Sequence, residues 1–307
     1  MKKTNSNIKI IVLSFLLLLQ LIFRKIEKIY YNKIKVCVCT LGKNENRYIR
    51  EFVQHYEKYG VDKIFLYDNN DINGERFEVV INDYSEKGFV DILDWRGKKK
   101  QIYNIMNDCY KQNYRSYDWL IFYEIDEFIH LNNYSNVKSF LSEDKFRNCT
   151  LIYLNLVCHT DNNLLYYENK SLFERFPELV PDSKLGGQKL EVKFILKGHT
   201  PNIVIRNIHN CNNNIPNCNG YGHNNKISNI YSTELDKKNF YIDHFYSKST
   251  EEFINKVMRG NPCNVPKNYD FERINKYFAQ SEITKDKIEL IEKRTGHNLA
   301  YLKKMIN

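Results

Sequence analysis

A regular alternation of short apolar runs and longer amphipathic runs between residues 35 and 125 constrains the fold most strongly. Within the amphipathic run 46–59, Ile49, Val53 and Tyr56 recur at helical spacing, and Gly60 follows as a helix stop. Strands that alternate with helices of this length predict a mainly parallel α/β sheet with helices on both faces. The predicted strands are 35–40, 62–67, 89–95 and 119–125, and the predicted helices are 46–59, 75–86 and 99–115.

The pattern is weaker beyond residue 135, but it still indicates strands first and helices last. The expected strands are 150–158, 192–197, 203–206 and 240–245, and the expected helices are 249–259, 271–279, 285–294 and 299–305. Residues 207–229 read as an asparagine-rich loop. We therefore expect one domain over 34–262, followed by a helical C-terminal extension over 263–307.

The chain begins with an apolar run at 10–23 that has lysine and arginine residues on both sides. A membrane span needs roughly 17–25 apolar residues, so this run must extend over about residues 8–24. No small-residue cleavage signal follows it. We predict a single-pass, uncleaved signal anchor and a short stem to residue 33, with a cleaved leader or a buried helix as alternatives. The body would face the Golgi lumen in a eukaryote, or the anchor would lie in the inner membrane of a bacterium.

Composition excludes some functions and leaves the cysteine chemistry open. The net charge of +9 is spread along the chain without a basic block, which argues against nucleic-acid binding. It is compatible with a diphosphate substrate or an anionic membrane surface. Cys37 and Cys39 alternate on one strand, and we expect buried free thiols there. Cys211 and Cys218 lie in the polar loop and could form a disulfide.

Acidic residues follow the fourth predicted strand directly. Glu124 and Asp126 are two residues apart, so on an extended backbone both carboxylates would face one ligand. Carboxylate oxygens suit Mg²⁺ or Mn²⁺ that holds a diphosphate. The alternative is a solvated acidic turn.

Polar residues also follow three other predicted strands, at the edge where ligands bind in such sheets. Lys43 and Glu45 follow the first strand, where the alternative is ordinary helix capping. Asp68 follows the second strand and could contact a ribose or base, or form a turn. After the last strand, His244 could complete a metal site as a neutral ligand, and Lys248 could neutralise a diphosphate.

Three segments together resemble glycosyltransferase family 92 and its family 2-like relatives: Cys39–Asn70, Asp118–Phe128 and His244–Gly260. The resemblance implies a GT-A fold of the Rossmann type and a nucleotide-sugar donor. It also implies a divalent metal on a DxD-type motif, and inversion at the anomeric carbon.

By position, the resemblance makes Asp126 and His244 metal ligands and Glu124 the first acid of the motif, where the family usually has aspartate. Gln101 and Asp68 match positions that line the nucleotide pocket. A further segment, from which Lys193, Lys197 and His209 come, also resembles the family.

The same resemblance makes Asp161 a candidate general base, with an ordinary turn as the alternative. Glu127 is a neighbouring acid that could serve instead. The resulting hypothesis is a metal-dependent, inverting transfer of a hexose, galactose by analogy, from a UDP-sugar to a glycan acceptor.

Two rival hypotheses remain open. The chain could be a non-catalytic sugar- or nucleotide-binding protein that keeps the fold, which the glutamate at position 124 favours. It could also be a zinc module that uses the irregularly spaced residues His209, Cys211, Cys218 and His223.

Overall fold

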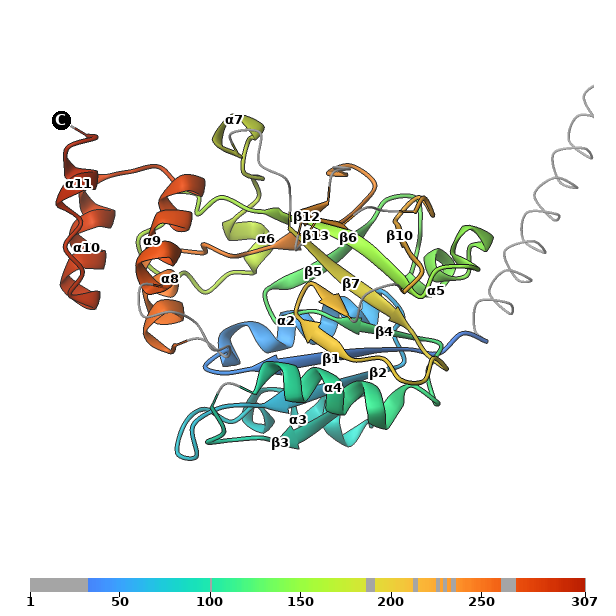
Figure 1. Ribbon diagram of the computed structural model, residues 1–307. Helices are drawn as coiled ribbons and strands as arrows, with labels where there is room; N and C mark the ends of the chain where they lie inside the picture. The colour runs from blue at the N-terminus through green and yellow to red at the C-terminus, as the bar shows by residue number, and fades with distance from the viewer. Residues whose placement is uncertain are drawn as a thin grey trace, which may run out of the picture.

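A mixed sheet of nine strands forms the centre of the molecule (Figure 1). The computed structural model describes residues 33–99, 101–185, 191–211, 215–224, 227–228, 231–232, 236–260 and 269–306. In this part of the chain the strand order is β3-β2-β1-β4-β7-β6-β13-β5, with β10 beside β6. The sheet divides into an N-terminal half that is parallel and a second half that is not.

The N-terminal half confirms the predicted alternation of strands and helices. Its elements are β1 (Val36–Gly42), α2 (Asn46–Lys58), β2 (Lys63–Asp68), α3 (Glu78–Glu86), β3 (Val90–Asp94), α4 (Ile102–Asn113) and β4 (Trp119–Phe122). Strand β1 pairs in parallel with β2 and β4, and β2 pairs in parallel with β3. The carboxyl ends of β1 and β2 therefore lie at one edge of the sheet.

Helix α2 shows why this half folds as predicted. Its apolar residues repeat at helical spacing and bury one face: Tyr48, Ile49, Phe52, Val53 and Tyr56. Each large apolar side chain removed from water stabilises the fold by about 1.5–3 kcal/mol. The helix ends before Gly60, whose φ of 76° is in the left-handed region that glycine adopts readily.

Among the described residues, the second half adds three antiparallel pairings to the mainly parallel sheet that the sequence predicts, so the sheet is mixed. Its strands are β5 (Glu127–Leu131), β6 (Leu151–Cys158), β7 (Val192–Lys197), β10 (Asn217–Asn219) and β13 (Phe240–His244). Strand β7 runs antiparallel to both β4 and β6, and β13 runs antiparallel to β5 but parallel to β6. Strand direction depends on how the long connections cross the sheet, so the residues of a strand do not reveal it.

Register in this half joins distant segments. In the antiparallel pair of β13 and β5, His244 lies opposite Glu127, and Asp243 lies opposite Phe128. The turn that follows β4 and the end of β13 are thereby neighbours.

Short elements complete this part of the body. They are α5 (Val137–Leu141), the 3₁₀ turn η1 (Asp144–Phe146), α6 (Leu172–Arg175), α7 (Asp182–Leu185), β8 (Ile205–Asn207), β9 (Asn210–Cys211), β11 (Ile227–Ser228) and β12 (Tyr231–Ser232). The region predicted as a loop therefore contains short strands.

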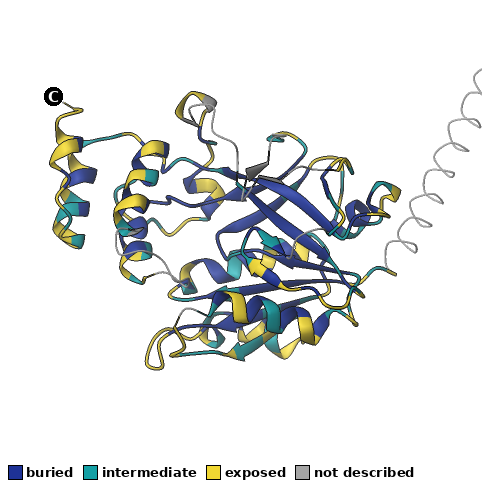
Figure 2. Cartoon of the chain, viewed as in Figure 1, coloured by how far each residue is buried: buried dark blue, intermediate teal, exposed yellow. Residues whose placement is uncertain are grey.

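The expected C-terminal helices are present and stand at one end of the sheet (Figure 1). They are α8 (Thr250–Met258), α9 (Tyr269–Gln280), α10 (Lys285–Thr295) and α11 (Ala300–Lys303). Phe253, Tyr277 and Ile288 belong to a separate apolar core that these helices share. Figure 2 shows buried inward faces and exposed outer faces on α9 and α10. The predicted anchor at residues 8–24 lies outside the described residues, and none of the described helices combines the length and apolarity that crossing a bilayer requires.

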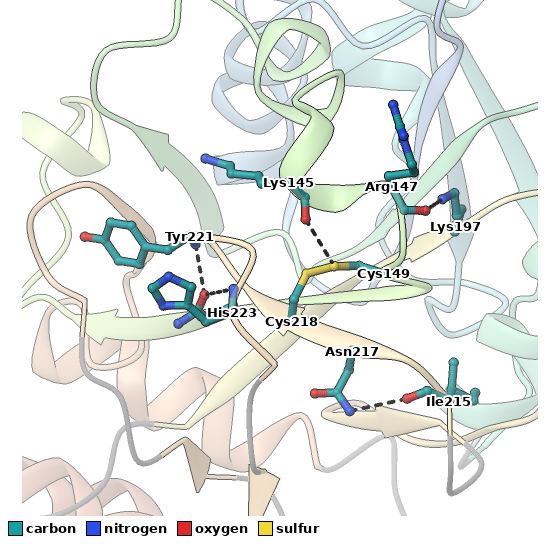
Figure 3. Close-up of a disulfide and its surroundings, with 10 residues drawn as sticks. Lys145, Arg147, Cys149, Lys197, Ile215, Asn217, Cys218, Tyr221 and His223 are labelled. Atoms are coloured by element: carbon teal, nitrogen blue, oxygen red, sulfur yellow. Dashed lines mark hydrogen bonds between the residues drawn. A yellow bond between two sulfur atoms is a disulfide. The ribbon is translucent and has the colours of Figure 1, made fainter.

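Two disulfides correct the cysteine predictions. Cys39 on β1 bonds to Cys109 on α4, so only Cys37 is the buried free thiol that we expected. Cys218 bonds to Cys149 instead of Cys211, which is a buried free thiol (Figure 3). The reason is that β10 pairs in parallel with the start of β6, which brings Cys218 beside Cys149.

Candidate active site

The acidic residues after β4 form a tight turn that joins β4 to β5. The amide of Glu127 donates to the carbonyl oxygen of Glu124 at 2.9 Å, so Ile125 and Asp126 lie at the centre of the turn. The carboxylates therefore do not share a direction through an extended backbone, as we had expected. Glu124 and Asp126 nevertheless line the same cavity.

Asp126 is buried at the centre of a cationic cluster. Its Oδ2 atom lies 3.1 Å from Lys248 Nζ and 2.6 Å from Lys256 Nζ, and its Oδ1 atom lies 3.8 Å from His244 Nε2. Burial alone would raise the pKa of Asp126, but the charges of Lys248 and Lys256 outweigh burial and hold the pKa well below its usual range. The carboxylate is therefore ionised.

Three side chains in this cluster could hold a metal ion. One ligand atom each from Asp126, Glu127 and His244 lies within 4.8 Å of the others. Burial lowers the pKa of His244 to about 3, so its imidazole is neutral and able to donate a lone pair. Two carboxylates with one imidazole are a donor set that fits Mn²⁺. The residues present therefore fit the ion that the sequence predicts.

The two glutamates of the turn have positions different from those expected. Glu124, predicted as a metal ligand, lies 2.8 Å from Lys193 Nζ and is outside the group of three, whereas Glu127, predicted as a base, is inside it. The Oε1 atom of Glu127 lies 3.0 Å from Lys193 Nζ, and burial raises the pKa of Glu127 to about 8. Burial would also raise the pKa of Glu124, but Lys193 lowers it to about 2.

Two adjoining cavities lie beside the cluster. The smaller has a volume of about 490 Å³ and includes Glu124 and Asp126 in its lining, and the larger has a volume of about 820 Å³ and lies over α2 and α8. Lys43, Asp71 and Arg259 line both. The smaller cavity is at the carboxyl ends of β1 and β2, where ligands bind in sheets of this kind.

Gly42, the last residue of β1, allows a close approach to the acidic turn. A Cβ atom at this position would lie 2.4 Å from Ile125 Cδ1 and 2.6 Å from Phe77 Cζ. Both of these side chains are fully buried, so neither could move away cheaply. The smaller cavity therefore depends on a residue without a side chain at its floor.

Six residues were predicted to bind the nucleotide-sugar donor, and three of them, Lys43, Glu45 and Glu124, line the smaller cavity, while Lys248 lines the larger one. Lys43 Nζ pairs with Asp71 at 2.8 Å, and Glu45 pairs with Arg259 at 3.0 Å. Asp68 is buried instead, where it accepts hydrogen bonds from Asn70. Burial raises the pKa of Asp68 above its usual range.

Gln101 precedes α4 and lines neither cavity. It donates to the carbonyl oxygen of Lys99 and accepts from Asn104. Two lysines from the same segment, Lys98 and Lys99, line the smaller cavity. In this segment Lys98 and Lys99, and not Gln101, are therefore the residues that reach the cavity.

Asp161 lies away from this cluster, in a closed arrangement with the C-terminal helices. Its Oδ2 atom accepts from Tyr277 at 2.7 Å and lies 2.6 Å from Lys287 Nζ, whose side chain is 1% exposed. Asp161 lines neither of the two cavities. Its role as a base is a prediction without geometric support from this position.

The zinc hypothesis is wrong for the described residues. Cys218 is committed to its disulfide, and the Nδ1 atom of His209 lies 2.6 Å from the carbonyl oxygen of Val192.

Lys197, from the segment that also resembles the family, donates to the carbonyl oxygen of Arg147. Lys193 is the member of that segment that reaches the acidic turn.

The sequence reasoning missed Lys256 and Arg259, which come from α8. The only available signal was their spacing: Glu252, Lys256 and Arg259 follow at intervals of four and three, so they share one face of the helix. Ser249 begins α8 with a capping box, in which its side chain and Glu252 satisfy each other's backbone amides. The cap fixes where this face points.

The family model for glycosyltransferase family 92 matches residues 32–289, which is well over half of the chain. The chain belongs to glycosyltransferase family 92. This result confirms the resemblance that the sequence motifs indicated. All members of the Asp126 cluster lie inside the region that matches the family.

Curated proteins of family 92 from plants match shorter segments. A protein of Oryza sativa subsp. japonica is 33% identical over 96 residues, which are 31% of this chain and 16% of that protein. A protein of Ricinus communis is 25% identical over 127 residues, which are 41% of this chain and 22% of that protein. The matched segments thus span less than a quarter of these relatives.

Solved structures of Staphylococcus aureus TarS are weakly similar to this family 92 chain. The complex of TarS residues 1–349 with UDP is 10% identical, with 80% of this chain and 71% of that chain covered and a TM-score of 0.38. The complex with UDP-GlcNAc is 11% identical, with 86% and 80% covered and a TM-score of 0.38. TM-scores this low do not establish a shared fold.

Proposed function

We propose that this family 92 chain transfers a sugar from a nucleotide-sugar donor to a glycan acceptor. The observation that supports this proposal most directly is the position of Asp126. Its ionised carboxylate lies in the lining of a cavity at the carboxyl ends of the sheet, among two lysines and a neutral imidazole. A site of this charge can hold a diphosphate and stabilise it as it departs.

The donor would occupy the smaller cavity. Lys98, Lys99 and Arg259 in its lining offer cations for phosphate oxygens, while Leu41 and Asn69 offer apolar and amide contacts for a nucleoside. Uridine as the nucleoside and galactose as the sugar are our proposals from the family resemblance.

The metal proposal assigns Mn²⁺ or Mg²⁺ to Asp126 and His244, with Glu127 within reach. When bound, the ion would supply positive charge against the diphosphate leaving group. The chain's own residues contribute to the same end, because Lys248 and Lys256 direct their ammonium groups toward Asp126. We propose a single displacement, which inverts the anomeric carbon.

Of the two base candidates, Glu127 is the one that lies in the cluster. A pKa of about 8 makes Glu127 a stronger base than an ordinary glutamate, able to take a proton from an acceptor hydroxyl in its deprotonated form, although like Asp161 it lines neither cavity. Asp161 is instead committed to Lys287 and Tyr277. We therefore retain Glu127 as the proposed base.

The test is a donor screen with the full chain. UDP-galactose, UDP-glucose and UDP-GlcNAc are each incubated with Mn²⁺, and release of UDP is measured with and without a glycan acceptor. We expect acceptor-dependent UDP release with at least one donor and its loss in Asp126→Ala. Absence of turnover with every donor would contradict the proposal.

One observation favours a second candidate function, a binding protein without catalysis. The residue at the first acid position is Glu124, and its carboxylate is tied to Lys193. Calorimetry separates the two functions, because a binding protein would retain UDP-sugar affinity with Mn²⁺ yet release no UDP.

The two disulfides support a proposal about location. Disulfides persist in oxidising compartments, so we infer that the body lies outside the cytosol, in a lumen or a periplasm, behind the predicted anchor at residues 8–24. Alkylation of the natively expressed protein before and after reduction, read by mass, would test this. Cys39, Cys109, Cys149 and Cys218 should be labelled only after reduction, and labelling of all four beforehand would contradict the inference.

A further inference from the structure

The larger cavity has more positive charge than the donor proposal needs. Six of its lining residues are cationic and three are acidic. The acidic turn does not contribute to this lining, because Glu124 and Asp126 line only the smaller cavity. The larger cavity is therefore a separate, cation-rich space that adjoins the donor site.

The acidic side chains of this cavity are already neutralised or bonded. Asp71 pairs with Lys43 at 2.8 Å, and Glu75 accepts from the amide of Asn46 at 2.9 Å. Glu252 pairs with the Arg175 guanidinium at 2.6 Å and accepts hydrogen bonds from Ser249 Oγ and Tyr48 OH, each at 2.6 Å. Asp71 and Glu252 are thus paired with cations, and Glu75, whose partner is a neutral amide, is the one lining carboxylate without a cation partner among the described residues.

Two of the cations, Arg47 and Arg294, form no ion pair with any carboxylate among the described residues. They come from α2 and α10, and both are exposed. The guanidinium of Arg47 lies 4.4 Å from the centre of the Tyr167 ring, a contact that positions the group but does not cancel its charge. Guanidinium groups without a carboxylate partner suit a phosphate or a carboxylate ligand, which they bind with paired hydrogen bonds.

We propose that the larger cavity binds an anionic group, a phosphate or a carboxylate, on the glycan acceptor. This inference rests on the proposed function and names the acceptor class. Lys248 and Lys256 line the larger cavity and contact Asp126, so the two spaces meet at the cluster. An acceptor anchored by Arg47 and Arg294 would thus reach toward the donor sugar.

An apolar contact is available for the rest of such an acceptor. Met258 lines the same cavity and is 60% exposed, so its apolar surface is accessible to a ligand there. The apolar face of a sugar ring could pack against it while the anionic substituent binds the guanidinium groups.

The experiment is calorimetric titration of the full chain, saturated with UDP and Mn²⁺, with glucose 6-phosphate, glucuronate and glucose. We expect both charged probes to bind at least about tenfold more tightly than glucose at low ionic strength, with a smaller advantage near 150 mM salt. The tighter of the two charged probes identifies phosphate or carboxylate as the preferred group. Equal binding of all three probes would overturn the proposal.

Variants connect the effect to the cavity. Arg47→Gln/Arg294→Gln should weaken the charged probes about tenfold, and Arg47→Lys/Arg294→Lys should recover part of the loss because the charge remains. The matched control is Arg147→Gln, a side chain that is 75% exposed and paired with Asp144 away from both cavities. Arg147→Gln should leave all three affinities unchanged.

Titration of the same variants with UDP separates this proposal from the donor proposal. If Arg47→Gln/Arg294→Gln weakens UDP as much as the charged probes, the guanidiniums belong to the donor site and the inference is wrong. If the wild-type chain does not bind UDP, the proposed function fails, and titrations without UDP still decide whether the cavity prefers anions.

Discussion

Two buried aspartates of this chain look alike at first and differ in what surrounds them. Asp126 is 3% exposed and Asp161 is 2% exposed, and each has a lysine Nζ at 2.6 Å. Asp126 is shared by a second lysine and an imidazole and lines a cavity. Asp161 has one lysine and one tyrosine hydroxyl, and it lines neither cavity.

The difference teaches how to recognise a binding site among buried charges. Asp161 and Lys287 form a balanced pair, which has no remaining charge to offer a ligand. Asp126 has two ammonium groups for one carboxylate, and this imbalance beside a cavity is what an anionic ligand would complete. Burial and ion pairing alone therefore do not indicate function, because structural pairs have the same features.

The largest expected effect on activity is at the Asp126 cluster. Asp126→Asn keeps the size of the side chain and should reduce UDP release from the donor by about 10²–10³-fold, as loss of one electrostatic contact to a transition state does. Lys256 is 16% exposed, so its freed ammonium can reach water, whereas Lys248 is 4% exposed and loses its counter-charge, so the variant should also lose some stability. Initial rates and a melting curve check both points, and near-normal rates would refute the assignment of Asp126.

The closed pair should show the reverse behaviour. Asp161→Asn leaves Lys287 buried without a counter-charge, which should lower the free energy of unfolding by about 3–5 kcal/mol. Activity per folded molecule should change little. Denaturant titration of Asp161→Asn, Lys287→Met and the double variant should show that the double variant recovers much of the loss. Strong loss of activity without destabilisation would instead favour Asp161 as the base.

Stabilisation by Mn²⁺ should distinguish the surroundings of Asp126 from those of Asp161, with a smaller free-energy change than the substitutions above. A ligand at about 100 times its Kd stabilises the folded state by about 2.7 kcal/mol, so Mn²⁺ should raise the melting temperature of the wild type. Asp161→Asn should keep this increase, and Asp126→Asn should lose it. The same increase in both variants would place the metal elsewhere, and a chelator should reverse the effect in the wild type.

The smallest effect tests the surplus charge itself. Lys256→Met removes one of two ammonium groups from Asp126, so turnover should fall about tenfold because a cation for the leaving group is lost. Mn²⁺ affinity, measured by calorimetry, should rise because a competing charge is gone. The control is Lys285→Met, whose side chain is 79% exposed and remote from Asp126. A fall in both quantities would show that Lys256 supports the site in another way.

The sequence predicted the elements that depend on local pattern. Strands β1–β4 and helices α2–α4 follow from apolar periodicity, and the acidic turn and His244 follow from motifs at strand ends. Strand β5 was missed because its residues directly follow the acidic run, with no turn signal to separate them. Its partner is β13, which lies far along the chain.

The missing members of the site have partners that are remote in sequence. Lys256 is 130 residues from Asp126, and Lys193 is 69 residues from Glu124. The disulfides join cysteines 70 and 69 residues apart, so proximity in the sequence misled the pairing of Cys218. The closed environment of Asp161 was equally hidden, because it comes from Tyr277 and Lys287 on helices predicted without their contacts.

Because β13 pairs with β5 in one antiparallel register, the site depends on which residues of β13 face each side of the sheet. Successive residues of a strand face opposite sides, and here Asp243 meets His130 and His159 on one side while His244 meets Asp126 on the other. Deleting one residue within β13 would exchange these two roles and present a third carboxylate to the cluster. Changes of length in the loops that connect β5 to β13 through β6, β7 and β10 should therefore cost little, whereas a single-residue slip inside this five-residue strand would silence the site.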